Sequence, residues 1–162
     1  MTIRSSTLRS YVLAFRVLSW LVVATYFGQA VLAGQFLSGT YPALRLHGIG
    51  GTVADVVVIL AVIAGALLCW HGKGRSWPFW AALGLLVLNQ VQNGVGAARM
   101  VHLHIPLGVA MLGVAVAVAL AAGQDGPLIR NRAVERRTRQ ERSPAARPVS
   151  SPAPTTATGE PR

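Results

Sequence analysis

Four long apolar runs, almost free of charge, constrain the fold of this chain more than any other feature. They extend roughly from Leu13 to Leu37, His47 to Trp70, Trp77 to Ala98 and His104 to Ala122. A helix of about 20 apolar residues is long enough to cross the hydrocarbon core of a bilayer. Because a chain in lipid must satisfy its backbone hydrogen bonds internally, each run predicts a transmembrane α-helix.

The connections between these runs are short, so successive helices are expected to be antiparallel neighbours. The predicted fold class is therefore all-α: an integral membrane four-helix bundle with up-down-up-down order and a disordered basic C-terminal tail. The expected boundaries are a cytoplasmic N-terminus over 1–12, the bundle over 13–122, and the tail over 123–162. The tail is rich in arginine, proline and serine and lacks the apolar residues that would offset its ordering entropy.

The charge distribution indicates a membrane protein rather than a nucleic-acid-binding protein. Only 12% of the residues are charged, against about a quarter in soluble domains. With the N-terminus in the cytoplasm, thirteen of the fifteen Lys and Arg residues lie inside, and only Arg45 and Arg99 lie outside. This asymmetry predicts a multi-pass protein of the cytoplasmic (inner) membrane with both termini cytoplasmic. Membrane lipids are the expected partners of its apolar surface and basic tail.

Two histidine motifs carry the candidate chemistry. R-L-H-G-I-G-G (45–51) opens the second run and H-L-H-I-P-L-G (102–108) opens the fourth. His47 and His104 are therefore expected at the same depth, on helices that lie diagonally across a simple four-helix bundle. Neutral imidazole is a common ligand of metals and haem iron. We therefore predict that these two histidines are the axial metal ligands of a haem b.

Two glycines and two arginines fit the same hypothesis. Gly51 and Gly108 follow the histidines by one helical turn and would leave clearance for the porphyrin. Arg45 and Arg99, the only predicted outer cations, would pair with the haem propionates. Among the alternatives, both histidines could be interfacial residues without a ligand, and the glycines could serve helix packing. His102, two positions before His104, also stays open as the ligand, because Pro106 could delay the start of the last helix.

Asp55 is the one acidic residue within the predicted spans. A buried carboxyl group is costly unless it is protonated or paired. It could accept protons near a cofactor, or it could bond an amide of the third run, such as Asn89. The amides of that run, which could alternatively bind a quinone headgroup, are Asn89, Gln90, Gln92 and Asn93.

The placement of L-H-G-I-G-G and L-H-I-P-L-G resembles one four-helix half of the heme A synthase family and, more loosely, membrane cytochromes b. The resemblance covers Leu13 to Ala122 and implies that His47 and His104 ligate haem on the outer side. The chain departs from that family because Ala43 and Leu44, rather than a glutamate, precede Arg45. It also has no cysteine pair in the outer loop, so the family's oxidative chemistry is not implied.

The sequence thus favours a membrane b-type haem protein that transfers electrons or handles haem, with a quinone or a redox protein as partner. Whether it is an enzyme and how it oligomerises are left open by the sequence. One alternative is a non-catalytic membrane scaffold or accessory subunit without a cofactor, whose basic tail recruits lipid or a protein. Another is a component of a small transporter or channel that uses Asp55.

Overall fold

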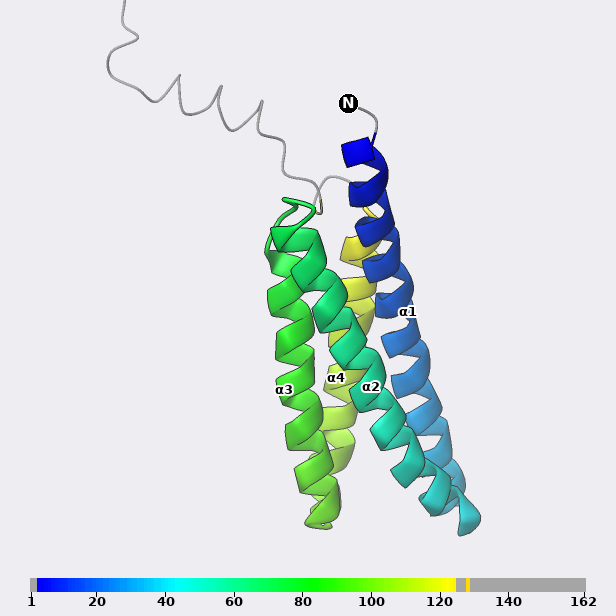
Figure 1. Ribbon diagram of the computed structural model, residues 1–162. Coiled ribbons are helices and arrows are strands. Elements are labelled where there is room, and N and C mark those ends of the chain that lie inside the picture. Colours follow the sequence, from blue (N-terminus) through cyan, green and yellow to red (C-terminus); the bar gives the residue numbers. More distant parts are fainter. Residues whose placement is uncertain (1–2, 125–127, 129–162) are drawn as a thin grey trace, which may run out of the picture. The chain divides into compact units, whose positions relative to one another are not determined.

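The described part of the chain forms four α-helices joined by short turns (Figure 1). This computed structural model describes residues 3–124 and 128, which belong to one compact unit, Met1–Arg130; a second unit, Asn131–Arg162, lies outside the described residues. The predicted tail over 123–162 therefore falls almost entirely outside them. The helices are α1 (Ile3–Leu37), α2 (Pro42–Trp70), α3 (Trp77–Ala97) and α4 (Val101–Gly123).

The helices run up, down, up and down, which confirms the predicted all-α bundle. The α1–α2 and α3–α4 turns lie at one end, here called the distal end. The start of α1, the α2–α3 turn and the end of α4 lie at the other, the proximal end (Figure 1). Successive helices pack against each other, and α4 packs against α1 even more than against α3. As a result α2 and α4 face each other diagonally across the bundle.

The outer surface of the bundle is apolar. Large side chains that are more than half exposed occur on every helix: Leu13, Phe27, Val56, Val87 and Leu120. Among residues 3–124 and 128, three helical segments are long and apolar enough to cross a membrane: Thr7–Leu37, Pro42–Trp70 and Val101–Gly123. An apolar surface this extensive fits contact with lipid.

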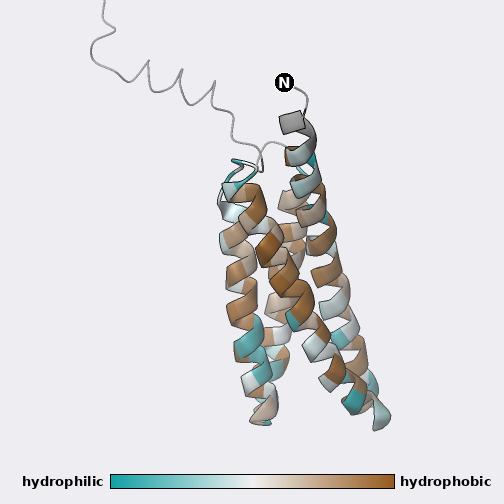
Figure 2. Cartoon of the chain, in the orientation of Figure 1, coloured by the Kyte–Doolittle hydropathy of each residue, from teal (hydrophilic) through white to brown (hydrophobic). Residues whose placement is uncertain are grey.

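The helix α3 is long enough to cross a membrane, with 21 residues, but it is less apolar than the other three helices. A fourth span was expected there. Its polar residues account for the difference. Four amide side chains lie in its distal half, where Figure 2 shows a hydrophilic zone. Two of these amides, those of Asn89 and Gln90, donate to the carboxylate of Asp55 on α2 at 2.6 and 2.7 Å. The residues that lower the hydropathy of α3 therefore make polar contacts with α2.

Small residues allow the helices of the bundle to approach closely. The buried positions of α2 and α4 are mostly alanine, including Ala54, Ala61, Ala115 and Ala119. Two helix backbones approach closely at Gly65 of α2, where an added Cβ would lie 2.9 Å from the backbone of Phe79. Packing of small residues is a common source of helix association in membranes.

Gly65→Ala is expected to destabilise the bundle by about 1–3 kcal/mol, the usual cost of overpacking. The new methyl group would meet backbone atoms of α3, which cannot turn aside as a side chain can. Thermal unfolding in detergent measures the effect. Gly84→Ala is the matched control because an added Cβ there meets nothing within 4 Å. Equal melting temperatures for the two variants would contradict this account of α2–α3 packing.

Candidate functional site

The rings of His47 and His104 meet inside the distal part of the bundle. Their centroids lie 6.0 Å apart with an angle of 72° between the ring planes. His47 lies in the second turn of α2 and His104 in the first turn of α4, and both are half-buried. Two histidines separated by more than fifty residues thus come together from diagonal helices.

The start of α4 determines which histidine takes this position. The helix begins at Val101 and includes Pro106, so both His102 and His104 lie on regular helix. Residues two apart on a helix point to nearly opposite sides. His102 is exposed and His104 lies against His47. His104 is therefore the residue that the fold pairs with His47.

Each histidine ring is held by a backbone carbonyl of the preceding helix. Nδ1 of His47 lies 3.1 Å from the carbonyl oxygen of Gln29, and Nδ1 of His104 lies 3.1 Å from that of Gln92. A carbonyl oxygen can only accept, so each Nδ1 must carry the proton. In a neutral ring this leaves Nε2 with its lone pair, the form that ligates a metal.

The two glutamines also contact the helices through their side chains. The amide of Gln92 donates to the carbonyl oxygen of His104 at 2.8 Å and lies against Gly108. The side chain of Gln29 lies against Gly50, where an added Cβ would overlap its amide nitrogen. The two helical hairpins therefore share one arrangement. The backbone carbonyl of a glutamine on the first helix accepts a hydrogen bond from the histidine ring, and the side chain of that glutamine covers a glycine of the second helix.

The glycines of the two motifs accommodate amide side chains. A Cβ added at Gly51 would lie 3.6 Å from Oδ1 of Asn93, and one at Gly108 would lie 2.9 Å from Nε2 of Gln92. The proposed clearance for a porphyrin at these glycines stays a prediction about the haem-bound protein. Gly96 of α3, which sequence reasoning missed, borders the histidine directly: its Cβ would lie 2.8 Å from Cε1 of His104.

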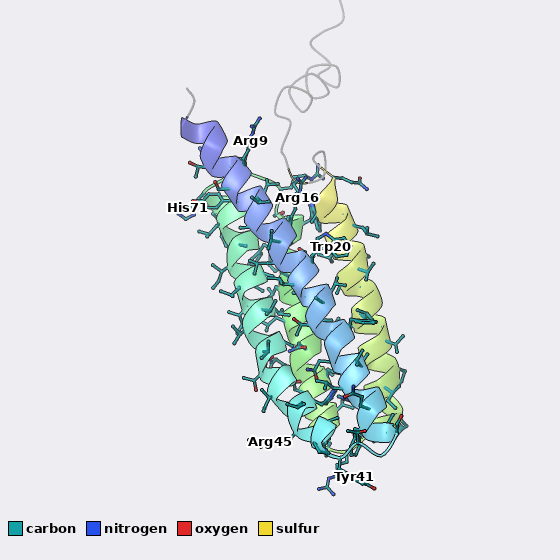
Figure 3. The ribbon with its side chains drawn as sticks, turned by 90° about the vertical axis from the view of Figure 1, so that its right-hand side faces the viewer. Arg9, Arg16, Trp20, Tyr41, Arg45 and His71 are labelled. Carbon is teal, nitrogen blue, oxygen red and sulfur yellow. The ribbon has the colours of Figure 1, made fainter. Side chains whose placement is uncertain are left out.

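Arg45 and Arg99 both lie at the distal end, close in sequence to the histidines. Arg45 is exposed in the first turn of α2, and Figure 3 places it beside Tyr41 at the end opposite Arg9. Arg99 is exposed in the α3–α4 turn, where its φ of 57° lies in the left-handed region. Within the described residues neither side chain has an ion-pair partner, so both are available to an anionic group.

A second polar cluster surrounds Asp55, deeper in the bundle. Oδ1 of Asp55 accepts from Nδ2 of Asn89 at 2.6 Å and from Nε2 of Gln90 at 2.7 Å. Nδ2 of Asn93 lies 3.2 Å from Oδ2 of the same carboxylate. The expected contact between Asp55 and Asn89 is therefore present, and two more amides of α3 join it.

Two buried polar atoms lack a hydrogen-bond partner among the described residues. They are the hydroxyl of Tyr26 on α1 and Oε1 of Gln92 on α3. Buried polar groups are normally paired, so these two atoms are exceptions within the described part of the bundle. Nothing in the sequence pattern distinguishes Tyr26, because a single aromatic residue in an apolar run is usually part of the core.

The donor set limits the kind of metal centre that this region can form. Within the described part of the chain no group of three or more His, Cys, Asp or Glu side chains could hold a metal ion. Comparison with protein-family models, with curated proteins and with solved structures finds no match to this chain.

Proposed function

We propose that this protein is an integral membrane b-type haem protein, with His47 and His104 as axial ligands. The observation that carries the proposal is the facing histidine pair, in which both Nδ1 atoms are engaged with backbone carbonyls. That arrangement keeps each Nε2 available for iron. Haem supplies the remaining four ligands of the iron, which suits a site with only two histidines.

The spacing of the two rings supports the same ligand. A histidine nitrogen bonds zinc at about 2.0–2.1 Å. With a bond of similar length from each ring to a shared iron, the two ring centroids would lie about 6.3 Å apart, since each centroid lies about 1.1 Å behind its nitrogen. The observed separation is 6.0 Å. Two imidazoles on one axis can be twisted relative to each other, so an interplanar angle of 72° is compatible with shared ligation.

Arg45 and Arg99 would bind the propionates, which carry negative charge and favour the aqueous edge of the bundle. The distal end would then face the outside of the cytoplasmic membrane, with the basic proximal end inside, as the distribution of Lys and Arg favours. When bound, haem supplies one-electron redox chemistry. The histidine pair lies near the distal end, so the protein would exchange electrons with a quinol or a redox protein at that face of the membrane, or would pass the haem itself on.

Haem stoichiometry tests this function. Apo-protein in detergent is titrated with ferric haem, and bound haem per chain is measured after gel filtration by the pyridine haemochrome method. We expect one haem for each chain. Retention of no haem above a detergent-only control would reject the proposal and favour a scaffold or accessory subunit without a cofactor.

Replacing Arg45 or Arg99 with glutamine is expected to weaken haem binding about fivefold for each residue, since an exposed ion pair contributes up to about 1 kcal/mol. Raised salt should reduce this difference by screening the charges. The same haem titration gives the affinities. Arg9→Gln, an exposed arginine at the proximal end, serves as the control. Equal affinities for Arg9→Gln and the distal variants would exclude both arginines as propionate partners.

A further inference from the structure

The α2–α3 turn at the proximal end carries two exposed cations, Lys73 and Arg75. Figure 2 shows this turn as a hydrophilic segment beyond the apolar parts of α2 and α3. Asp55, the only acidic residue that the structure describes, lies in the middle of α2 and bonds to amides of α3. Within the described part of the chain neither cation therefore has an acidic partner, and both are available to an external anion.

Packing of the turn against the bundle fixes its backbone. The backbone N–H of Gly74 donates to the carbonyl oxygen of Leu68 at 2.9 Å. A Cβ added at Gly74 would lie 3.0 Å from the carbonyl oxygen of Leu128, and one added at Gly72 would lie 3.1 Å from a side chain of α1. Both glycines thus lie against the bundle, whereas Lys73 between them is exposed. The cations of the turn are therefore attached to a backbone with a defined position.

Three aromatic rings lie at the same end of α2 and α3. The ring centroids of Trp70 and Phe79 are 4.9 Å apart, and those of Phe79 and Trp80 are 5.0 Å apart. Trp70 and Trp80 are 62% and 63% exposed, whereas Trp77 is half-buried and packs edge-on against Phe15. Exposed tryptophans at the ends of membrane helices typically lie at the level of the lipid headgroups, where one end of the side chain is apolar and the other is wet.

The cations and the exposed tryptophans are close together along the chain. Lys73 follows Trp70 by three residues, and Arg75 precedes Trp80 by five. Lys and Arg bind phosphate groups, whereas indole rings suit the boundary between headgroups and acyl chains. A neutral lipid would contact the rings and leave both cations without an anion. A soluble anion would pair with the cations and leave the rings uncovered, so the set is complementary to a single molecule with an anionic head and apolar chains.

We propose that two cations and two tryptophans at this turn form a docking site for an anionic phospholipid. These four residues, here called the turn site, are Trp70, Lys73, Arg75 and Trp80. The cations bind the phosphate of the lipid, and the tryptophans contact its ester region and the adjoining acyl chains. The lipid belongs to the leaflet that the proximal end meets. The turn site uses neither histidine of the pair, so this inference does not depend on the haem function.

Native mass spectrometry of the full-length protein in neutral detergent tests the turn site, with phosphatidylglycerol and phosphatidylcholine as the probes. One Lys or Arg beside an anionic headgroup contributes about fivefold to binding, so two contribute about thirtyfold. Lys73→Gln/Arg75→Gln is therefore expected to weaken the tightest binding of phosphatidylglycerol about thirtyfold and to leave phosphatidylcholine unchanged. The exchange Lys73→Arg/Arg75→Lys, which keeps both charges, should bind phosphatidylglycerol like the wild type.

Arg45→Gln/Arg99→Gln removes the same charge from the distal end and should leave the affinity for phosphatidylglycerol unchanged. A folded Lys73→Gln/Arg75→Gln protein with wild-type affinity for this lipid would overturn the inference. An equal loss in the distal variant would also overturn it, because net charge would then be the cause. Displacement of phosphatidylglycerol by inorganic phosphate at the same concentration would assign the cations to a soluble anion, again against a lipid site.

Quenching by brominated lipid provides a second readout, which locates the bound molecule. Brominated phosphatidylglycerol at a low mole fraction in phosphatidylcholine vesicles should quench tryptophan emission more than brominated phosphatidylcholine at the same fraction. Trp70→Phe/Trp80→Phe should lose this excess. Trp20→Phe, which replaces an exposed tryptophan of α1 (Figure 3), should retain it. Excess quenching that survives in Trp70→Phe/Trp80→Phe would contradict an anionic lipid at the turn site.

Discussion

His47→Ala and His104→Ala are each expected to abolish stable low-spin haem binding. Each change removes one of the two facing rings, and the described residues offer no third ligand to replace it. Because axial ligation by both imidazoles fixes the spin state of the iron, the α band of the reduced protein should be lost in both variants. Optical spectra of proteins purified in parallel, with haem content per chain, give the measurement.

His102→Ala is the matched control because it removes an exposed histidine from the same turn of α4. It should keep the wild-type spectrum and haem content. Circular dichroism of all three variants separates ligand loss from unfolding, since each paired histidine also bonds a carbonyl of the neighbouring helix. If a folded His47→Ala protein kept the low-spin band, ligation by this pair would be excluded.

Gly96→Ala is expected to displace the ring of His104 and weaken haem binding by about five- to thirtyfold, which corresponds to 1–2 kcal/mol of overpacking. A Cβ at this position would lie 2.8 Å from Cε1 and 3.0 Å from Nδ1 of His104. Since Nδ1 is also bonded to the carbonyl of Gln92, the ring cannot move away without weakening that bond. Haem titration and the fraction of low-spin iron measure the effect.

Gly94→Ala provides the comparison for this substitution. It lies two residues earlier on α3, and an added Cβ there meets nothing within 4 Å. We expect Gly94→Ala to bind haem like the wild type. Indistinguishable haem affinity in the Gly94 and Gly96 variants would mean that the contact between Gly96 and His104 does not position the ligand.

The fold could be predicted because the features that determine it occur along the whole of residues 13–122. Apolar runs, short connections and the requirement for internal backbone hydrogen bonds lead to the same four-helix bundle. The bounds of α4 were less predictable. Pro106 suggested a later start, but proline is tolerated near the beginning of a helix, where few backbone N–H groups have partners. The helix therefore begins before both histidines.

The pairing of His47 with His104 could be predicted because both residues open helices that lie diagonally in the bundle. The groups that hold the two rings in place could not be predicted. Their partners at Gln29 and Gln92 are backbone carbonyls, and a carbonyl acceptor has no residue type that a sequence pattern could reveal. The contact of Gly96 with His104 depends on the rotation of α3 about its axis, and glycine has common packing roles in membrane helices.

The most direct test of the central claim is the reduced-minus-oxidised optical spectrum of the full-length protein, purified in detergent from haem-replete cells. The account predicts one low-spin b-type haem per chain, with a single α band that depends on both His47 and His104. A colourless, folded protein, or a haem whose spectrum is unchanged when both histidines are replaced, would contradict it.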